Sequence, residues 1–228
     1  MDVSSQFERF RYSCFDNSYG ASRDGLDVEA ALSLSDSERT EAEALVLNVL
    51  PHTNDSRPFT AAGIMKISAA SPILKARMNS GFSPEYDYLR VEAAHALYLI
   101  EKWGDAPALI VDILKNTPKT RSQQWTRTLA VWALWDFADE PLCHAALFET
   151  VEDDDNFIGF LAIDALEKIY SHNATVCALL VKLSNTQVAP HRWKPEYLQS
   201  RRQLFLELQS ITSIKMPAIA MEKRVGWQ

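Results

Sequence analysis

The chain has 228 residues, of which 47% are hydrophobic and 23% are charged, and its formal net charge is −7 at pH 7. This length and composition favour a globular protein with one large or two small domains over a disordered chain. The acidic balance argues against a general nucleic-acid-binding protein, and no apolar run approaches the ~20 residues of a membrane span.

The first 34 residues are expected to form a capping segment ahead of the rest of the chain. Phe7, Phe10, Cys14 and Phe15 recur at helical spacing, which predicts a short amphipathic helix. The opening stretch MDVSSQFERFRYSC is acidic and polar. A secretory signal would instead be basic and then apolar, so we expect a cytoplasmic protein.

A pattern of small and aliphatic residues recurs along the chain. Counted from Arg90 as zero, apolar residues lie at offsets 3, 4, 6, 7 and 10, and the same offsets from Arg127 and Gly159 are also apolar. This spacing describes one buried stripe on a helix of 3.6 residues per turn. Looser copies begin at Pro58 and Arg201, so the five starting points lie 32, 37, 32 and 42 residues apart.

Second apolar segments lie beside these stripes, and each of them predicts another helix. Pro72, Pro107 and Pro141 stand in the first turn, where a helix tolerates proline best. Ser35 followed by Glu38 forms a capping-box pattern for the first segment. The chain therefore predicts tandem helix–turn–helix units, which share a core because each is too small to bury its own apolar face. The expected second segments are 41–50, 71–80, 106–116, 140–151 and 174–183.

The stretch LRVEAAHALYLI (residues 89–100) resembles the second helix of HEAT-like repeats, with its arginine, alanine pair, Ala-Leu and final aliphatic residue. The copies from Arg90 and Arg127 match that pattern best, whereas the other three depart from it. The resemblance implies an all-α fold, an α-solenoid of about five HEAT-like helix-turn-helix repeats, with a plain helical bundle as the alternative. We expect an N-terminal capping segment (1–34), a repeat domain (35–212) and a C-terminal tail (213–228).

The sequence provides little support for catalysis, and we expect no enzyme, metal or cofactor. Cys14, Cys143 and Cys177 are an odd number of distant cysteines, which favours reduced and buried thiols. The nearby histidines lack the close ligand pairs of a structural zinc site. His95 has no sequence partner that would make it a general base, and phosphate-loop, G-x-S-x-G and H-E-x-x-H motifs do not occur.

Charge is unevenly distributed along the chain. Residues 136–155 carry eight acidic side chains and no lysine or arginine, whereas residues 190–228 carry seven basic and three acidic side chains. An acidic run in a turn is usually a solvated cap that the helix dipole favours, and Asp155 or Asn156 is expected to cap the next helix. The asymmetry nevertheless indicates a directed binding surface.

Offsets 2, 5 and 9 are expected to point away from the buried stripe, toward the inner face of a curved stack. Trp132, flanked by leucines and carboxylates, has the composition of an interface centre. Packing of Trp132 between neighbouring helices is the equally weighted alternative. The predicted protein-binding residues are Glu92, His95, Leu129, Trp132, Asp136, Asp139, Glu140, Asp153, Asp154, Asp155 and Asp164.

HEAT-like arrays chiefly bind other proteins, and short acidic examples are similar to bacterial immunity proteins. The resemblance therefore implies a monomeric or weakly homo-oligomeric protein that neutralises a cognate toxin, typically a basic one such as a nuclease, without binding nucleic acid or membrane. A scaffold or adaptor subunit of a larger assembly is one alternative. A HEAT-like DNA-glycosylase-type protein is another, and its basic stripe would comprise Lys115, Lys119, Arg121, Arg127 and residues 192–202.

Overall fold

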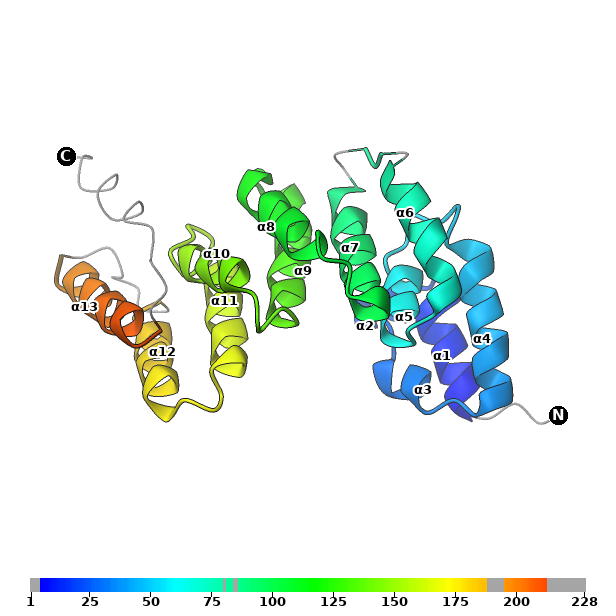
Figure 1. The fold of residues 1–228 in the computed structure, drawn as a ribbon, viewed down its shortest axis with the longest axis horizontal. Helices are drawn as coiled ribbons and strands as arrows, with labels where there is room; N and C mark the ends of the chain where they lie inside the picture. Colours follow the sequence, from blue (N-terminus) through cyan, green and yellow to red (C-terminus); the bar gives the residue numbers. More distant parts are fainter. Residues whose placement is uncertain (1–4, 80, 84–85, 188–194, 213–228) are drawn as a thin grey trace. The chain divides into compact units, whose positions relative to one another are not determined.

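The computed structural model describes residues 5–79, 81–83, 86–187 and 195–212, and the regular structure of these ranges is entirely helical (Figure 1). The prediction of an all-α fold is therefore confirmed. The chain divides into two compact units, residues 1–110 and 111–228. Within the described ranges, none of the helices has the length and apolarity needed to cross a membrane. The predicted tail, 213–228, lies outside the described residues.

Unit 1 is built around α1, α5 and α7. The α1 helix packs against α3, α4 and α5, and α5 packs most extensively against α7. Phe7, Phe10 and Phe59 are fully buried in the core of this unit. The helices of unit 1 are α1 (Ser5–Phe15), α2 (Tyr19–Asp24), α3 (Val28–Leu32), α4 (Asp36–Val49), α5 (Arg57–Ile64), η1 (Ser68–Ala70), α6 (Ser71–Asn79) and α7 (Asp87–Glu101).

Small residues bring α5 and α7 into close contact. A Cβ added to Gly63 would lie 2.9 Å from Ala96 Cα, so the backbones meet where neither residue carries a large side chain. Ala96 lies at offset 6 of the repeated pattern. At the start of α4, the backbone amide of Ser35 donates to Glu38 Oε2 at 3.0 Å, and the predicted capping box is confirmed.

Unit 2 is centred on α11, which packs against α9, α10 and α12, and α12 packs in turn against α13. The division between the two units falls inside α8 (Ala106–Asn116). Ala162, Leu166 and Leu180 are among the fully buried residues of unit 2. Its remaining helices are η3 (Arg121–Gln123), α9 (Gln124–Trp135), α10 (Pro141–Val151), α11 (Asn156–Ile169), α12 (Ala174–Gln187) and α13 (Pro195–Thr212).

The repeated stripe is buried as predicted except at offset 10 of α7, where Ile100 is half-buried; Phe137 and Ile169 are buried at that offset. Offsets 3, 4, 6 and 7 are buried in α7, α9 and α11 alike. The expectation for offset 2 is wrong, because Glu92, Leu129 and Leu161 are buried at that position. A helix packed between several neighbours buries an arc wider than one stripe. Offset 5 differs, since Trp132 is exposed there, and His95 and Asp164 are half-buried.

Candidate functional site

Five large aromatic side chains are exposed on α9 and α11, and we call them the aromatic surface. Residues of this size are usually buried in folded proteins, and several exposed together indicate a site of interaction. The exposed fractions are 50% for Trp125, 42% for Trp132, 38% for Trp135, 49% for Phe157 and 45% for Phe160.

Two contacts show that α9 and α11 run side by side in the same direction. Near the starts of the helices, Gln124 Nε2 donates to Asp155 Oδ2 at 2.7 Å. At their ends, Lys168 Nζ lies 3.5 Å from the ring centroid of Trp135. The two helices that carry the exposed aromatic residues are therefore direct neighbours, with Trp135 of α9 in contact with Lys168 of α11.

Aromatic and charged contacts organise this surface. The rings of Trp125 and Trp132 meet edge to face, with centroids 5.9 Å apart and an interplanar angle of 89°. Lys168, which lies over Trp135, also donates to Asp164 Oδ2 at 2.9 Å. The surface thus combines an edge-to-face pair of indoles with an ammonium group that is held between a ring and a carboxylate.

Asp155 and Asp153 hold the start of α11 in place. Asp155, one of the two residues predicted as N-cap, is the N-cap of α11, and its Oδ1 accepts from the backbone amide of Phe157 at 3.0 Å. Asp153 forms a buried ion pair with Arg127 and bonds to Lys119 Nζ at 3.0 Å. Burial alone would raise the pKa of Asp153. The amide of Asp155, with Lys119 and Arg127, nevertheless keeps that pKa below its usual value.

The predicted binding residues do not form a single group. Glu92 and His95 belong to α7 in unit 1, and the others belong to unit 2. The buried residues present no side chain to a partner, because their surfaces are already covered. Trp132, Asp136, Asp139, Glu140 and Asp154 are exposed; His95, Asp155 and Asp164 are half-buried; Glu92, Leu129 and Asp153 are buried.

Sequence reasoning missed four members of the aromatic surface: Trp125, Trp135, Phe157 and Phe160. Trp125 lies seven residues before Trp132, which is two helical turns on the same face. Phe157 and Phe160 are three residues apart, a spacing that also makes two side chains neighbours on a helix surface. Aromatic spacing along each helix was therefore the signal that could have found them.

Glu92 connects two helices in the interior of unit 1. Its Oε2 accepts a hydrogen bond of 2.9 Å from Thr60 Oγ1 on α5. Burial raises the pKa of Glu92, against the smaller opposing effects of His95 and of the Thr60 bond. This carboxyl group is a packing element between α5 and α7.

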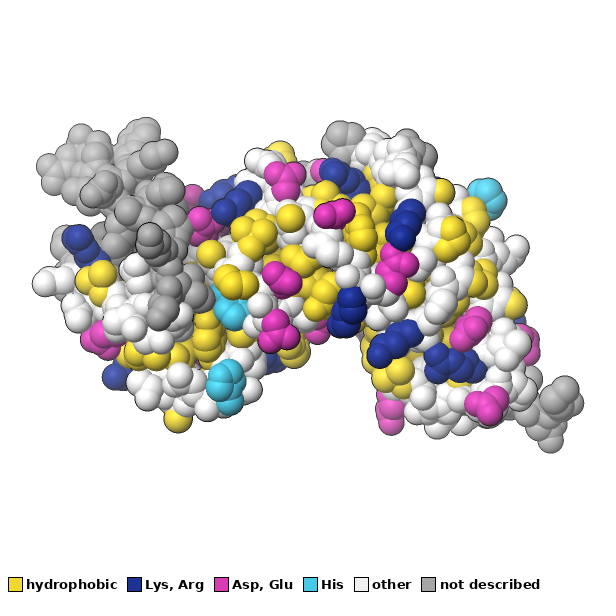
Figure 2. Space-filling model, in the orientation of Figure 1, with side chains coloured by type: hydrophobic (Ala, Val, Ile, Leu, Met, Phe, Trp, Pro, Cys, Tyr) yellow, Lys and Arg dark blue, Asp and Glu magenta, His cyan; other side chains and the backbone are white. Residues whose placement is uncertain are grey.

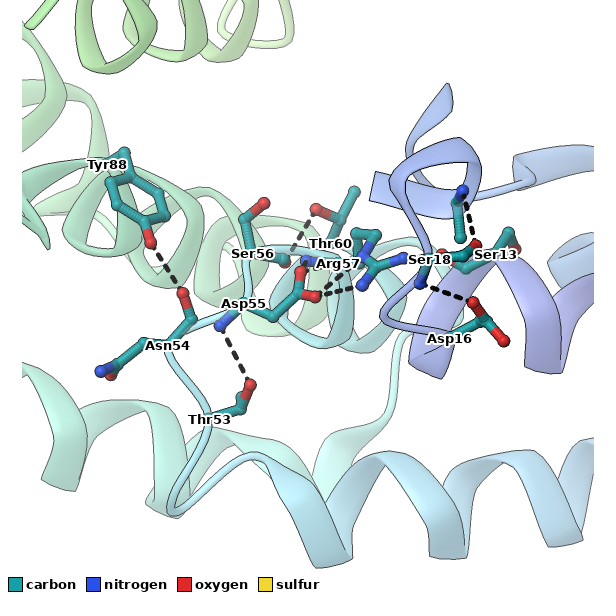
Figure 3. A network of polar contacts seen from close by, with 11 residues as sticks. Ser13, Asp16, Ser18, Thr53, Asn54, Asp55, Ser56, Arg57, Thr60 and Tyr88 are labelled. Carbon is teal, nitrogen blue, oxygen red and sulfur yellow. Dashed lines mark hydrogen bonds and ion pairs between the residues drawn. The ribbon is translucent and has the colours of Figure 1, made fainter. Parts of the chain in front are cut away.

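A polar network fastens the segment before α5 to its surroundings in unit 1 (Figure 3). Arg57 forms an ion pair with Asp55 and donates from Nη1 to the Ser13 carbonyl at 3.1 Å. Tyr88 Oη donates to the Asn54 carbonyl at 2.7 Å. These contacts tie the segment before α5 to α1, α5 and α7, so the network stabilises the packing of unit 1.

Other features of the described surface are less distinctive. A groove of about 470 Å³ between α1 and α4 has an apolar lining that includes Phe15, Leu45 and Val49. On the face drawn in Figure 2, acidic and basic side chains are interspersed with hydrophobic ones. Among the residues coloured on that face (Figure 2), neither acidic nor basic side chains form a large patch of their own.

Burial keeps two of the described thiols, Cys14 and Cys143, protonated by raising their pKa values. Cys14, Cys143 and Cys177 are free. Burial, and to a lesser extent Glu140, raise the pKa of Cys143 to about 12, which keeps that thiol protonated at neutral pH. Across the described ranges, no three histidine, cysteine, aspartate or glutamate side chains are grouped so that they could hold a metal ion.

Comparison of the chain with protein-family models, with curated proteins and with solved structures finds no match.

Proposed function

We propose that the chain is a non-catalytic protein that binds another protein through the aromatic surface. One observation carries this proposal: Trp125, Trp132 and Trp135 are exposed together on α9, beside Phe157 and Phe160 on α11. Tryptophan is strongly enriched among the few residues that supply most of the binding energy at protein interfaces. A partner that covers these rings removes a large apolar area from water.

We also propose that the helices form an α-solenoid of HEAT-like repeats. The support is the recurrence of the same buried offsets in α7, α9 and α11. Contacts between successive helices, as between α10 and α11 or α11 and α12, also fit an array in which each repeat packs on the next. In such an array the exposed positions of successive helices line one continuous binding face.

The partner in this proposal is a basic protein, and the first candidate is a bacterial toxin that the chain neutralises in the cytoplasm by covering it. A net charge of −7 attracts a basic protein over distance and accelerates its encounter. The exposed carboxylates of Asp136, Asp139, Glu140 and Asp154 lie on or after α9 in the same unit as the aromatic surface. A scaffold or adaptor protein would use the same surface on a different partner.

Ion pairs weigh against the alternative of a nucleic-acid-binding protein. Arg127 is buried against Asp153, where it cannot reach a phosphate group. Lys115 Nζ lies 2.8 Å from Glu149, and Lys119 is paired with Asp153. Three cations of the expected basic stripe, Lys115, Lys119 and Arg127, are therefore already compensated by carboxylates, whereas binding to nucleic acid depends on surplus positive charge.

The proposal is tested by titrating the chain with the protein encoded by the neighbouring reading frame in a calorimeter. We expect a one-to-one complex of the wild-type chain. In the variant Trp125→Ala/Trp132→Ala/Phe160→Ala, affinity should fall at least ~100-fold, because loss of a central aromatic residue typically costs about 1–2 kcal/mol or more.

Val181→Ala is the matched control, since Val181 is an equally exposed apolar residue on α12, away from the aromatic surface. It should leave the affinity unchanged. Circular dichroism of each variant shows whether the helices are retained. A folded triple variant that binds as tightly as the wild type would contradict the binding surface, and a wild-type chain that does not bind would contradict the toxin-neutralising role.

A further inference from the structure

We propose that the corner between Trp125 and Trp132 receives an arginine or lysine side chain of the partner. This inference rests on the proposed function, and it specifies the chemistry that the aromatic surface recognises. It depends on the ring geometry, on a cation that the same surface already holds, and on the surrounding charge.

Two indoles at right angles form the walls of the corner. With centroids 5.9 Å apart and planes at 89°, the edge of one ring points at the face of the other, so a face of each ring borders the right angle between them, and both rings are about half exposed. Side chains on a helix lean toward its N-terminus, so Trp132 reaches back toward Trp125. Leu129 lies between them in sequence on the same helical face and is buried. A cation within about 6 Å of an indole face is attracted by the ring quadrupole.

The adjacent tryptophan shows that this surface holds a cation in this way. Lys168 Nζ lies 3.5 Å from the Trp135 ring centroid and 2.9 Å from Asp164 Oδ2. The ammonium group is thus placed between an indole face and a carboxylate. On α9, Asp136 follows Trp132 by four residues, the spacing that puts two side chains on the same helical face. Asp136, the C-cap residue of α9, thus supplies an exposed carboxylate one helical turn after Trp132.

The charge around the corner favours a cationic side chain. Residues 136–155 contain eight acidic residues and no lysine or arginine, and Asp136, Asp139, Glu140 and Asp154 are exposed. Arg121, four residues before Trp125, is the closest basic residue on the N-terminal side. An anionic partner such as nucleic acid would meet these carboxylates, and a second copy of the chain would bring a charge of −7 to each side.

The experiment uses the full chain with 15N-labelled tryptophan, so that each of the six indole N–H signals reports on one ring. The chain is titrated with acetylated hexaarginine amide and with hexacitrulline amide, which has the same shape without the charge. We expect hexaarginine to shift the Trp125 and Trp132 signals first and to bind at least ~10-fold more tightly than hexacitrulline. A short DNA duplex is the competing probe.

Substitutions then localise the effect. Trp132→Leu should weaken hexaarginine binding by about threefold to thirtyfold, and Trp132→Phe should weaken it less because a ring remains. Val181→Ala on α12 is the control, since this exposed apolar residue is not part of the aromatic surface, and it should leave hexaarginine binding unchanged. Removing the nearby positive charge with Arg121→Gln should strengthen binding by up to about threefold.

The inference is overturned if the two peptides bind equally, or if folded Trp132→Leu binds hexaarginine as the wild type does, because general attraction to an acidic chain would survive that change. It is also overturned if DNA shifts the same signals at lower concentration, or if sedimentation shows that two copies bury this corner. These outcomes leave the proposed function to its own test, in which a protein partner can still depend on the aromatic surface without a cation in the corner.

Discussion

Both units bury aromatic side chains, Phe137 and Phe148 among those of unit 2, but unit 2 also exposes a group of them on α9 and α11. In unit 1, Phe7, Phe10 and Phe59 are fully buried, and the aromatic residues hold α1, α5 and α7 together. In unit 2, Trp125 and Trp132 belong to a well-packed helix and yet remain about half exposed. Both units contain a buried arginine that forms an ion pair with an aspartate: Arg57 in unit 1 and Arg127 in unit 2. The comparison shows which rings stabilise the fold and which are available to a partner.

The largest effect expected from this comparison is on stability. Phe59→Ala should lower the free energy of unfolding by about 3–5 kcal/mol, because it leaves a cavity in the core of unit 1. Trp132→Ala should change it by less than about 1 kcal/mol, since that ring is partly in water already. Urea denaturation followed by circular dichroism measures both values. If both variants lost the same free energy of unfolding, Trp132 would stabilise the fold as much as Phe59 does. That result would contradict the distinction between rings that stabilise the fold and rings that are available to a partner.

A second prediction concerns the buried arginine–aspartate ion pair, which occurs in both units. Arg127→Met should destabilise the chain by about 3 kcal/mol, because it leaves the buried carboxylate of Asp153 with only Lys119 as its cation. The double variant Arg127→Met/Asp153→Asn should recover part of this loss, because the uncompensated charge is removed as well. Urea denaturation at pH 7 measures the three proteins. A double variant less stable than the single variant would show that the ion pair is not the reason for the loss.

The smallest effect is expected at Glu92 of unit 1. At the same offset of the repeated pattern, α9 and α11 of unit 2 carry the buried leucines Leu129 and Leu161. Burial raises the pKa of this carboxyl group in the folded chain above that in the unfolded chain. The unfolded chain therefore releases the proton at lower pH, and the contribution of Glu92 to stability falls as the pH rises from the unfolded pKa through the folded one. Glu92→Gln should reduce this decline between pH 4 and pH 8, and it can still accept the bond from Thr60.

Thermal unfolding at a series of pH values measures the change, with Glu41→Gln on the exposed side of α4 as the control. The control should have the same pH dependence as the wild type. If Glu92→Gln and the wild type lose stability in parallel over this range, then the carboxyl group is not the source of the pH dependence.

Local sequence patterns predicted most of the helical structure. Residues 106–116 form a helix with the expected bounds, the cap at Ser35 is where the sequence placed it, and Asp155 is one of the two caps that the sequence offered for α11. These features depend on neighbours within a few residues, so they are visible in one sequence. The role of Glu92 was not visible, since its buried position depends on Thr60, 32 residues away.

The candidate site was predicted in part. Trp132 was selected from its offset in the repeat and is exposed as expected, but Leu129, chosen by the same argument, is buried. Asp153 was selected for its charge, although Arg127 and Lys119 enclose it. Charge and periodicity in the sequence pointed to α9 and to the turn before α11 as the region of the candidate site. They do not reveal which of their side chains a neighbouring element covers.

The sequence by itself determined that this chain is helical and which residues form the main buried stripe, because helical periodicity is a property of adjacent turns. Only the tertiary structure decided that α9 and α11 lie side by side, and that Trp125, Trp132, Trp135, Phe157 and Phe160 share one exposed surface. The physical reason is that the exposure of a side chain depends on what packs against it, and the packing partners of a helix come from distant parts of the chain.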